Sequence, residues 1–277
     1  MKIALCNEIL RELGFAAQCE YAAALGYDAL ELAPFTLAAN PHLLDRSLRR
    51  ELRRTALASG LEIAGLHWLL VTPQGLSITS SDGRVRKKTI DVIRALIGLC
   101  ADLGGRVMVH GSPRQRQIAR GDDPEEAWRR AKATFEAIVP EAESSGVIYC
   151  IEPLPPVETN FLNSFADAAR LVDELNSPFF RTMIDARAAS LSETASAADL
   201  IETWMPSGKI AHIHLNDRDG RGPGQGRDRF TPILQALVKT HYEGFVSVEP
   251  FDFVPDARAT AARNIGYLRG ILESLGR

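Results

Sequence analysis

Six acidic or imidazole side chains occur in the sequence at the points where short apolar segments end. They are His67, His110, Glu152, Asp185, His214 and Glu249. Each preceding segment has the length and composition of a buried strand. One such residue alone could be a hydrogen-bonded anchor for a loop, but clustered carboxylates repel one another unless a cation or shared protons compensate them. The six residues therefore predict a divalent-cation site, provided that the fold brings the strand ends together.

The donor atoms of four of these residues indicate which cation to expect. Glu152, Asp185, His214 and Glu249 offer carboxylate oxygen and imidazole nitrogen. This mixed set suits Mn²⁺, Mg²⁺ or Co²⁺ better than a thiol-seeking metal. We expect Mn²⁺, with Mg²⁺, Co²⁺ or Zn²⁺ as alternatives.

The stretch "KIAHIHLND" carries two histidines on one expected strand. His212 and His214 are two residues apart, so they point to the same face of the strand at different heights. The spacing alone leaves open whether they form a half-buried structural pair or include a metal ligand.

Strand and helix signals alternate along the whole chain. The expected strands are Lys2–Leu5, Ala29–Leu32, Glu62–Leu66, Arg106–His110, Ile148–Ile151, Arg181–Ile184, Ile210–Leu215 and Phe245–Val248. Apolar residues at every third or fourth position predict helices over Leu44–Ala58, Val85–Leu103, Pro124–Ala142 and Phe165–Leu175. This alternation, without a linker, predicts a single-domain α/β protein, a (β/α)8 TIM barrel that spans residues 1–277. In such a barrel the carboxyl ends of the strands meet at one mouth, where active sites lie.

A doubly wound open sheet is the alternative fold. It would carry a glycine-rich phosphate-binding turn after the first strand. The corresponding stretch here, "CNEILRELGF", holds a single glycine. The barrel is therefore the favoured fold.

The composition is that of an ordinary globular protein with a net charge of −3. The densest basic runs, "RSLRRELRR" and "RVRKK", lie on expected helices among acidic or apolar residues, so we expect no nucleic-acid partner. No apolar run approaches the roughly 20 residues of a membrane helix. The four cysteines show no CxxC spacing and stand in apolar segments, which is typical of buried, reduced thiols. Because the N-terminus also lacks the pattern of a signal peptide, we expect a soluble cytoplasmic protein.

Four stretches in the second half of the chain resemble one known family. They are "CIEPLPPVETN", "TMIDARAAS", "HIHLND" with the "GPGQG" run that follows it, and "VSVEPF". In this order they are similar to the sugar phosphate isomerase/epimerase group of the xylose isomerase-like TIM barrels, which includes ketose 3-epimerases and hydroxypyruvate isomerase. The resemblance implies that Glu152, Asp185, His214 and Glu249 bind the metal and that Glu152 and Glu249 are catalytic. It also selects His214 over His212, which is then expected in a lower layer of the barrel.

The resemblance implies a substrate pocket that departs from the family pattern. Glu158 matches an acid that touches substrate hydroxyls in the 3-epimerases. Those enzymes carry a substrate-binding histidine three residues after the Asp, where this chain has Ala188 beside Arg187. They also carry an arginine shortly after the strand-7 histidine, and here Arg218 and Arg221 are near, at other spacings. We expect these two arginines to bind substrate with Glu158, and assign His67 and His110 to substrate binding as well.

The implied function is that of a divalent-metal-dependent isomerase or epimerase that acts on a keto-sugar or a related polyhydroxy carbonyl compound. The expected partner is a small-molecule sugar, and the chain could assemble as a homodimer or homotetramer. Glu152 and Glu249 would remove and return a proton through an enediolate.

Three alternatives stay open at this point. The same enolate chemistry supports β-elimination, as in the dehydroshikimate dehydratases of the superfamily. AP endonucleases build a multinuclear zinc site with histidines on the strands of His67 and His110. That site also needs a histidine at position 188 and a D-x-H motif, both absent here. A barrel that binds sugar without turnover is the third alternative.

Overall fold

The computed structural model describes residues 1–277 as a closed barrel of eight parallel strands in sequence order. The strands are β1 (Lys2–Cys6), β2 (Ala29–Leu32), β3 (Glu62–Leu66), β4 (Val107–His110), β5 (Ile148–Ile151), β6 (Phe180–Asp185), β7 (Ile210–Leu215) and β8 (Phe245–Val248). The barrel closes through the pairing of β1 with β8. The predicted fold is therefore confirmed.

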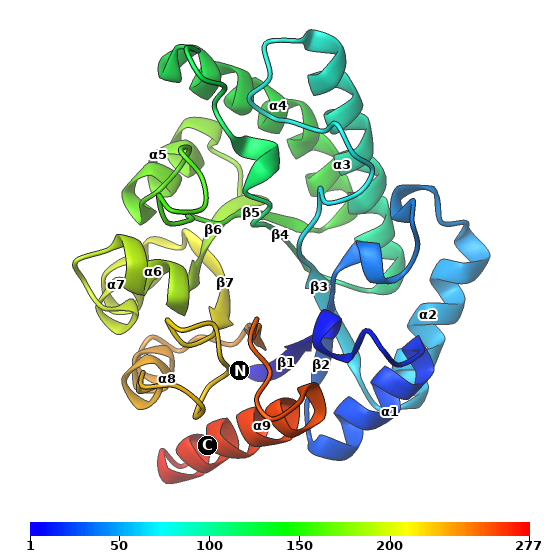
Figure 1. Cartoon of the computed structure of the whole chain (residues 1–277), viewed down its shortest axis with the longest axis vertical. Coiled ribbons are helices and arrows are strands. Elements are labelled where there is room, and N and C mark those ends of the chain that lie inside the picture. Colours follow the sequence, from blue (N-terminus) through cyan, green and yellow to red (C-terminus); the bar gives the residue numbers. More distant parts are fainter.

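A ring of helices surrounds the strands (Figure 1). The helices are α1 (Phe15–Leu25), α2 (Arg46–Ala58), α3 (Gly83–Leu103), α4 (Pro124–Ser145), α5 (Phe165–Leu175), α6 (Ala186–Ser192), α7 (Ala197–Trp204), α8 (Thr231–Lys239) and α9 (Ala257–Ser274). Their apolar faces and the outer faces of the strands form the main core, a cluster of 59 buried residues. None of the helices combines the length and the apolar character that a membrane span requires.

Local signals in the sequence explain where helices begin and end. The Asp123 side chain accepts hydrogen bonds from the backbone N–H groups of Glu125 and Glu126, at 2.8 and 3.1 Å, and Pro124 occupies the first helical position of α4. Gly146 ends this helix with a φ of 66°. Helix α2 begins at Arg46, two residues after the expected start at Leu44, because Asp45 caps it.

Alternating side chains of each strand fill the barrel interior below the mouth. Residues two positions apart share a face of a strand. The buried residues Cys150, Met183, His212 and Ser247 therefore lie one layer below Glu152, Asp185, His214 and Glu249. His212 Nε2 lies 2.7 Å from Glu31 Oε2 of β2, a strand that is not a neighbour of β7, so this contact crosses the interior.

We expect the substitution Gly65→Ala to destabilise the protein by about 2–3 kcal/mol, as overpacking in a filled core does. Gly65 on β3 pairs with Val107 on β4, and a Cβ at position 65 would lie 1.9 Å from the Val107 carbonyl oxygen. The strands would have to separate to admit it. Urea-induced unfolding measures the loss.

The matched control is Gly266→Ala on α9, where a Cβ meets nothing within 4 Å. Because alanine favours helix more than glycine does, this variant should gain up to about 1 kcal/mol. Equal effects of the two substitutions would contradict the close approach of β3 and β4.

Candidate functional site

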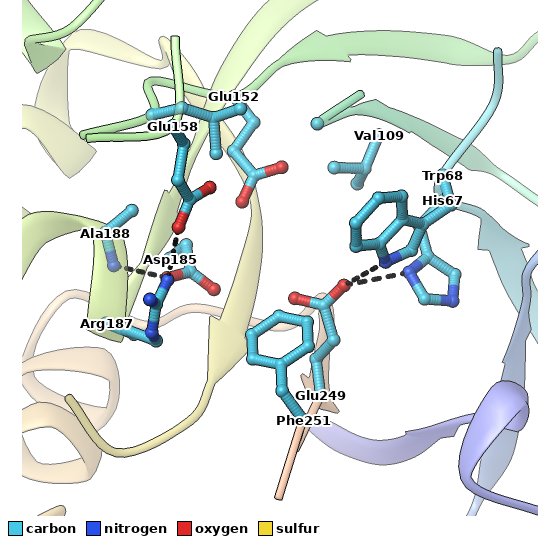
Figure 2. A pocket seen from close by; sticks show the side chains of 12 residues that line it. His67, Trp68, Val109, Glu152, Glu158, Asp185, Arg187, Ala188, Glu249 and Phe251 are labelled. Carbon is cyan, nitrogen blue, oxygen red and sulfur yellow. Dashed lines mark hydrogen bonds and ion pairs between the residues drawn. The ribbon is translucent and has the colours of Figure 1, made fainter. Parts of the chain in front are cut away.

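Four strand ends bring their polar side chains together at the mouth of the barrel. Glu152 follows β5, Asp185 ends β6, His214 lies near the end of β7, and Glu249 follows β8. Each is at most 6% exposed, and one ligand atom from each lies within 4.8 Å of those of the other three. Figure 2 shows Glu152 and Asp185 facing Glu249 across the pocket. The structure therefore brings together the four residues that the sequence predicts as metal ligands.

The electrostatics of this cluster fit a bound divalent cation. Burial raises the pKa of Glu152 well above its usual value, and the charges of Asp185 and Glu249 raise it further. Burial and Glu249 likewise raise the pKa of Asp185 to about 6. Carboxylates that repel one another in a buried space are stabilised when a cation neutralises them, and this oxygen and nitrogen donor set suits such a cation.

A buried carboxylate on β2 holds the histidine of the cluster. Glu31 is fully buried, and its Oε1 lies 3.2 Å from His214 Nε2, on the opposite side of the ring from Nδ1. Although burial opposes its ionisation, His212 and His214 hold the pKa of Glu31 well below its usual range. A carboxylate behind a histidine fixes the tautomer and the orientation of the ring. His214 thus directs Nδ1 toward the cluster, 3.1 Å from Glu249 Oε2.

The two carboxylate oxygens of Glu249 have different surroundings. Oε2 faces His214, whereas Oε1 accepts a hydrogen bond from Trp68 Nε1 at 3.0 Å and lies 3.1 Å from His67 Nδ1 (Figure 2). Burial opposes the ionisation of Glu249, but His214 and His67 prevail and lower its pKa to about 2. His67 therefore contacts a member of the cluster and also lines the pocket above it, so its binding of substrate stays a prediction.

Trp68 carries backbone strain next to the cluster. Its φ of 51° lies in the left-handed region that bulky residues avoid. Such strain persists where surrounding contacts hold the residue in place. The hydrogen bond from Trp68 to Glu249 is one such contact.

A small pocket opens above the cluster. Its lining combines charged groups with apolar side chains that suit a polyhydroxylated molecule. The lining residues are His67, Trp68, Val109, Gly111, Glu152, Leu154, Glu158, Asp185, Arg187, Ala188, Glu249 and Phe251.

An ion pair and an aromatic ring form one wall of this pocket. Arg187 Nη1 donates a hydrogen bond to Glu158 Oε1 at 2.5 Å, and the guanidinium carbon lies 5.7 Å from the centre of the Phe251 ring. Asp185 caps α6 by accepting a hydrogen bond from the Ala188 N–H at 2.6 Å, and so fixes the turn that carries Arg187. Arg187 therefore reaches the pocket beside Ala188, the position of the histidine in the 3-epimerases.

Three of the residues expected to bind substrate lie outside the pocket, which corrects that expectation. His110 is fully buried and points away from the barrel interior, with Nδ1 2.8 Å from Tyr149 Oη, because Val109 takes the inward position on β4. Arg218 and Arg221 lie on the loop between β7 and α8. Arg218 Nε donates a hydrogen bond to Asp228 at 2.7 Å, and Arg221 Nε donates one to Asp252 at 3.1 Å.

The sequence analysis missed a buried arginine beside the cluster. Arg116 is fully buried and donates hydrogen bonds to the backbone carbonyls of Glu152, at 2.5 Å, and His110. Burial lowers its pKa to about 10. Arg116 thus ties the ends of β4 and β5 together. Its stretch, "RQRQIAR", has the composition of a surface loop and gives no local sign of this role.

Comparisons with known proteins agree with this architecture. The profile of the family described as Xylose isomerase-like TIM barrel matches residues 19–271. The D-psicose 3-epimerase of Ruminiclostridium cellulolyticum is 26% identical, over 87% of this chain and 79% of its own length. The fructoselysine 3-epimerase of Escherichia coli O157:H7 is 22% identical, over 82% of this chain and 82% of its own length.

Solved structures of sugar epimerases share the fold. Those of D-psicose 3-epimerase in the presence of D-fructose and of the apo form of E. coli 3-keto-D-glucoside 4-epimerase match with TM-scores of 0.84, at 20% and 18% identity. Each alignment covers 98% of this chain and 99% of the other. The curated relatives support the broad class of sugar epimerases and isomerases for this chain.

We expect Glu152→Gln to stabilise the metal-free protein relative to metal-free wild type, increasingly so as the pH rises. The pKa of Glu152 is higher in the folded protein than in the unfolded chain, so the fold favours the protonated carboxyl group. Below the unfolded pKa the side chain is protonated in both states and costs no stability. As the pH rises through the folded pKa the carboxyl group ionises, and the folded protein loses stability. Glutamine has no such loss. Thermal unfolding of the chelator-treated proteins between about pH 5 and pH 8 measures the difference.

Addition of Mn²⁺ should stabilise the wild type more than the variant and so remove this order, because the cation neutralises the Glu152 carboxylate and binds the wild type more tightly. If the melting temperatures of the two metal-free proteins differ by the same amount at every pH, the repulsion assigned to Glu152 is absent.

Proposed function

Because this chain belongs to the xylose isomerase-like TIM barrel family, we propose that it is a divalent-metal-dependent ketose epimerase. The observation that carries the proposal is the placement of Glu152 and Glu249 on facing sides of one pocket (Figure 2). Asp185 and His214 lie on β6 and β7, the two strands between β5 and β8 in the barrel order, and belong to the same cluster. Relatives of this chain are named as 3-epimerases of psicose, ribulose and fructoselysine, which supports the same reaction class.

Glu152, Asp185, His214 and Glu249 are the residues that would hold the cation, and Mn²⁺ is the one we expect. When bound, a divalent cation withdraws electrons from the carbonyl and hydroxyl oxygens of a ketose and so makes the C–H between them more acidic. Glu31 supports this site by orienting His214.

The two glutamates supply the proton transfers in this proposal. One carboxylate removes the proton from the carbon next to the carbonyl, and the other carboxylic acid delivers a proton to the opposite face, which inverts that carbon. Both side chains are at most 6% exposed, so bulk water has little access to the reacting carbon. His67 and Trp68 fix Glu249 from behind through its Oε1.

Recognition of the rest of the sugar falls to the pocket wall. Glu158 and Arg187 offer an acceptor and donors for hydroxyl groups, and Trp68 and Phe251 offer apolar faces on which the C–H side of a sugar can rest. Ala188 leaves space where the 3-epimerases carry a histidine.

Deuterium exchange tests the reaction class directly. The Mn²⁺-loaded protein is incubated in D₂O with free ketoses, beginning with D-fructose, D-psicose and L-ribulose. We expect deuterium at the carbon next to the carbonyl and the appearance of the epimer, both observed by NMR. An aldose product would instead indicate isomerisation, and loss of water would indicate elimination. Sugar binding without exchange would show a barrel without turnover.

Metal analysis of purified variants tests the four-residue site. Asp185→Ala and His214→Ala should each lose the bound cation and the activity, because each removes a ligand from a shared centre. His212→Ala is the matched control, since this ring contacts Glu31 and Ser247 one layer below, and it should retain the metal. Full metal occupancy in both ligand variants would refute the site.

Glu249→Gln separates binding from proton transfer. Glutamine keeps the size of the side chain and one ligating oxygen but removes the base, so metal affinity should fall modestly and kcat by about 10²-fold or more. Steady-state kinetics at saturating Mn²⁺ measure this. Near wild-type turnover with metal bound would mean that Glu249 is only structural. Glu152→Gln should behave alike. If the two glutamates act on opposite faces, one of the two variants should still exchange the substrate proton with solvent without completing inversion.

A further inference from the structure

A second cluster of ligand-type side chains lies behind Glu249, at the end of β1. It consists of Cys6, Glu8, His67 and Glu249, and one ligand atom from each lies within 4.8 Å of those of the other three. The register of the barrel explains this placement. Leu5 pairs with Val248, so the next residues along β1 and β8, Cys6 and Glu249, are neighbours. The turn over Asn7–Leu10 then carries Glu8 over the same end of the barrel.

The facing atoms of His67 and Glu8 form a buried ion pair without an aligned hydrogen bond. His67 Nε2 and Glu8 Oε2 are both buried and lie 3.0 Å apart, yet neither makes an aligned hydrogen bond. The His67 side chain is 1% exposed, and its Nδ1 is already directed at Glu249 Oε1. Figure 2 shows the second ring nitrogen pointing away from the pocket. A buried imidazole nitrogen is therefore aimed at a carboxylate oxygen outside the site described above.

The spacing of these atoms fits two ligands of one cation. Nitrogen and oxygen ligands bind Zn²⁺ at about 2.0–2.2 Å, so two neighbouring ligands of a tetrahedral ion lie about 3.4 Å apart. A cation between His67 Nε2 and Glu8 Oε2, now 3.0 Å apart, would separate them by only a few tenths of an ångström. The charge fits as well, because the cluster holds the carboxylates of Glu8 and Glu249 and the ionisable thiol of Cys6 beside a single imidazole. A cation would have a route inward along Glu8, whose side chain is 15% exposed, whereas Cys6 is fully buried.

We propose that Cys6, Glu8, His67 and Glu249 bind a second divalent cation, with Glu249 shared between two adjacent metal sites. The sulfur, nitrogen and oxygen donors favour Zn²⁺ or Co²⁺ over Mg²⁺ or Mn²⁺. The two sites therefore differ in chemistry: one takes a hard cation on carboxylates and a histidine, and the other takes a softer cation on a thiolate. This inference shares Glu249 with the proposed function, and the experiment keeps the two apart.

Cobalt alone serves as the probe. The full-length protein is stripped with a chelator under reducing conditions and titrated with Co²⁺. Metal content and near-ultraviolet absorption are recorded, because thiolate bound to Co²⁺ gives a charge-transfer band that oxygen and nitrogen ligands do not. We expect two Co²⁺ per chain and a thiolate band that grows with one of them.

Variants assign the band to the second cluster. Cys6→Ser should abolish the band, and Glu8→Gln should weaken the binding of that Co²⁺ at least 10-fold, the usual effect of losing a group that supports a metal. Cys19→Ser is the matched control, because Cys19 is also a buried free thiol but lies on α1, outside the cluster. If Cys6→Ser does not fold, Glu8→Gln still decides the question, since Glu8 is partly exposed.

The first site is removed separately. Asp185→Ala should lose one Co²⁺ and keep the thiolate band, so failure of the proposed function and failure of the second site give different results. One Co²⁺ per chain without a band in the wild type would overturn the proposal and leave a proton between His67 and Glu8. A second Co²⁺ without a band, or a band that survives in Cys6→Ser, would overturn it equally.

Discussion

Compensation of buried negative charge is the constraint on which the mouth of this barrel depends. Five acidic side chains gather there, and four of them are at most 6% exposed. They are Glu8, Glu31, Glu152, Asp185 and Glu249. Moving a carboxylate out of water costs several kcal/mol unless partners restore what hydration supplied. Glu31 has two histidines, and Glu249 has His214, His67 and Trp68. Glu152 and Asp185 retain raised pKa values, which shows that the protein alone compensates them only in part.

The barrel tolerates this arrangement because the structure beneath it is well packed. The layer below the mouth contains Cys150, Met183, His212 and Ser247, all buried. Arg116 and the N-terminal turn of α6 hold the backbone beside Glu152 and Asp185. The packed layer beneath the mouth therefore supplies stability, whereas the raised pKa values of Glu152 and Asp185 mean that their ionised forms disfavour folding without a cation. Such local conflict between stability and chemistry is common at functional sites.

The pocket wall beside Ala188 is formed by Arg187 and Glu158. The resemblance to the 3-epimerases implies an altered substrate pocket at this position, because Ala188 stands where those enzymes are expected to carry a histidine. In the structure, Arg187 and Glu158 form an ion pair on that wall, and Phe251 lies beneath the guanidinium group. An arginine has a longer reach and more donors than a histidine, so in the proposed function this wall would bind hydroxyl groups farther from the four clustered residues.

The sequence by itself determined the strands, the barrel and the four residues proposed to hold a metal. The bounds of β2, β3, β5, β7 and β8 agree with the expected ones, because apolar runs and caps are local signals. The ends of parallel strands in a barrel must converge, so the acidic and imidazole residues at or next to the strand ends could be expected to meet. Their donor types and the family resemblance then singled out Glu152, Asp185, His214 and Glu249.

Only the tertiary structure decided which other side chains reach the site. His110 points outward because a shift of one residue reverses the face of a strand. Arg218 and Arg221 are held by acids that lie 10 and 31 residues farther along the chain. Glu31 and Arg116 meet His214 and Glu152 from other strands and loops. These contacts depend on register and on distant partners, and no local pattern of residues encodes either.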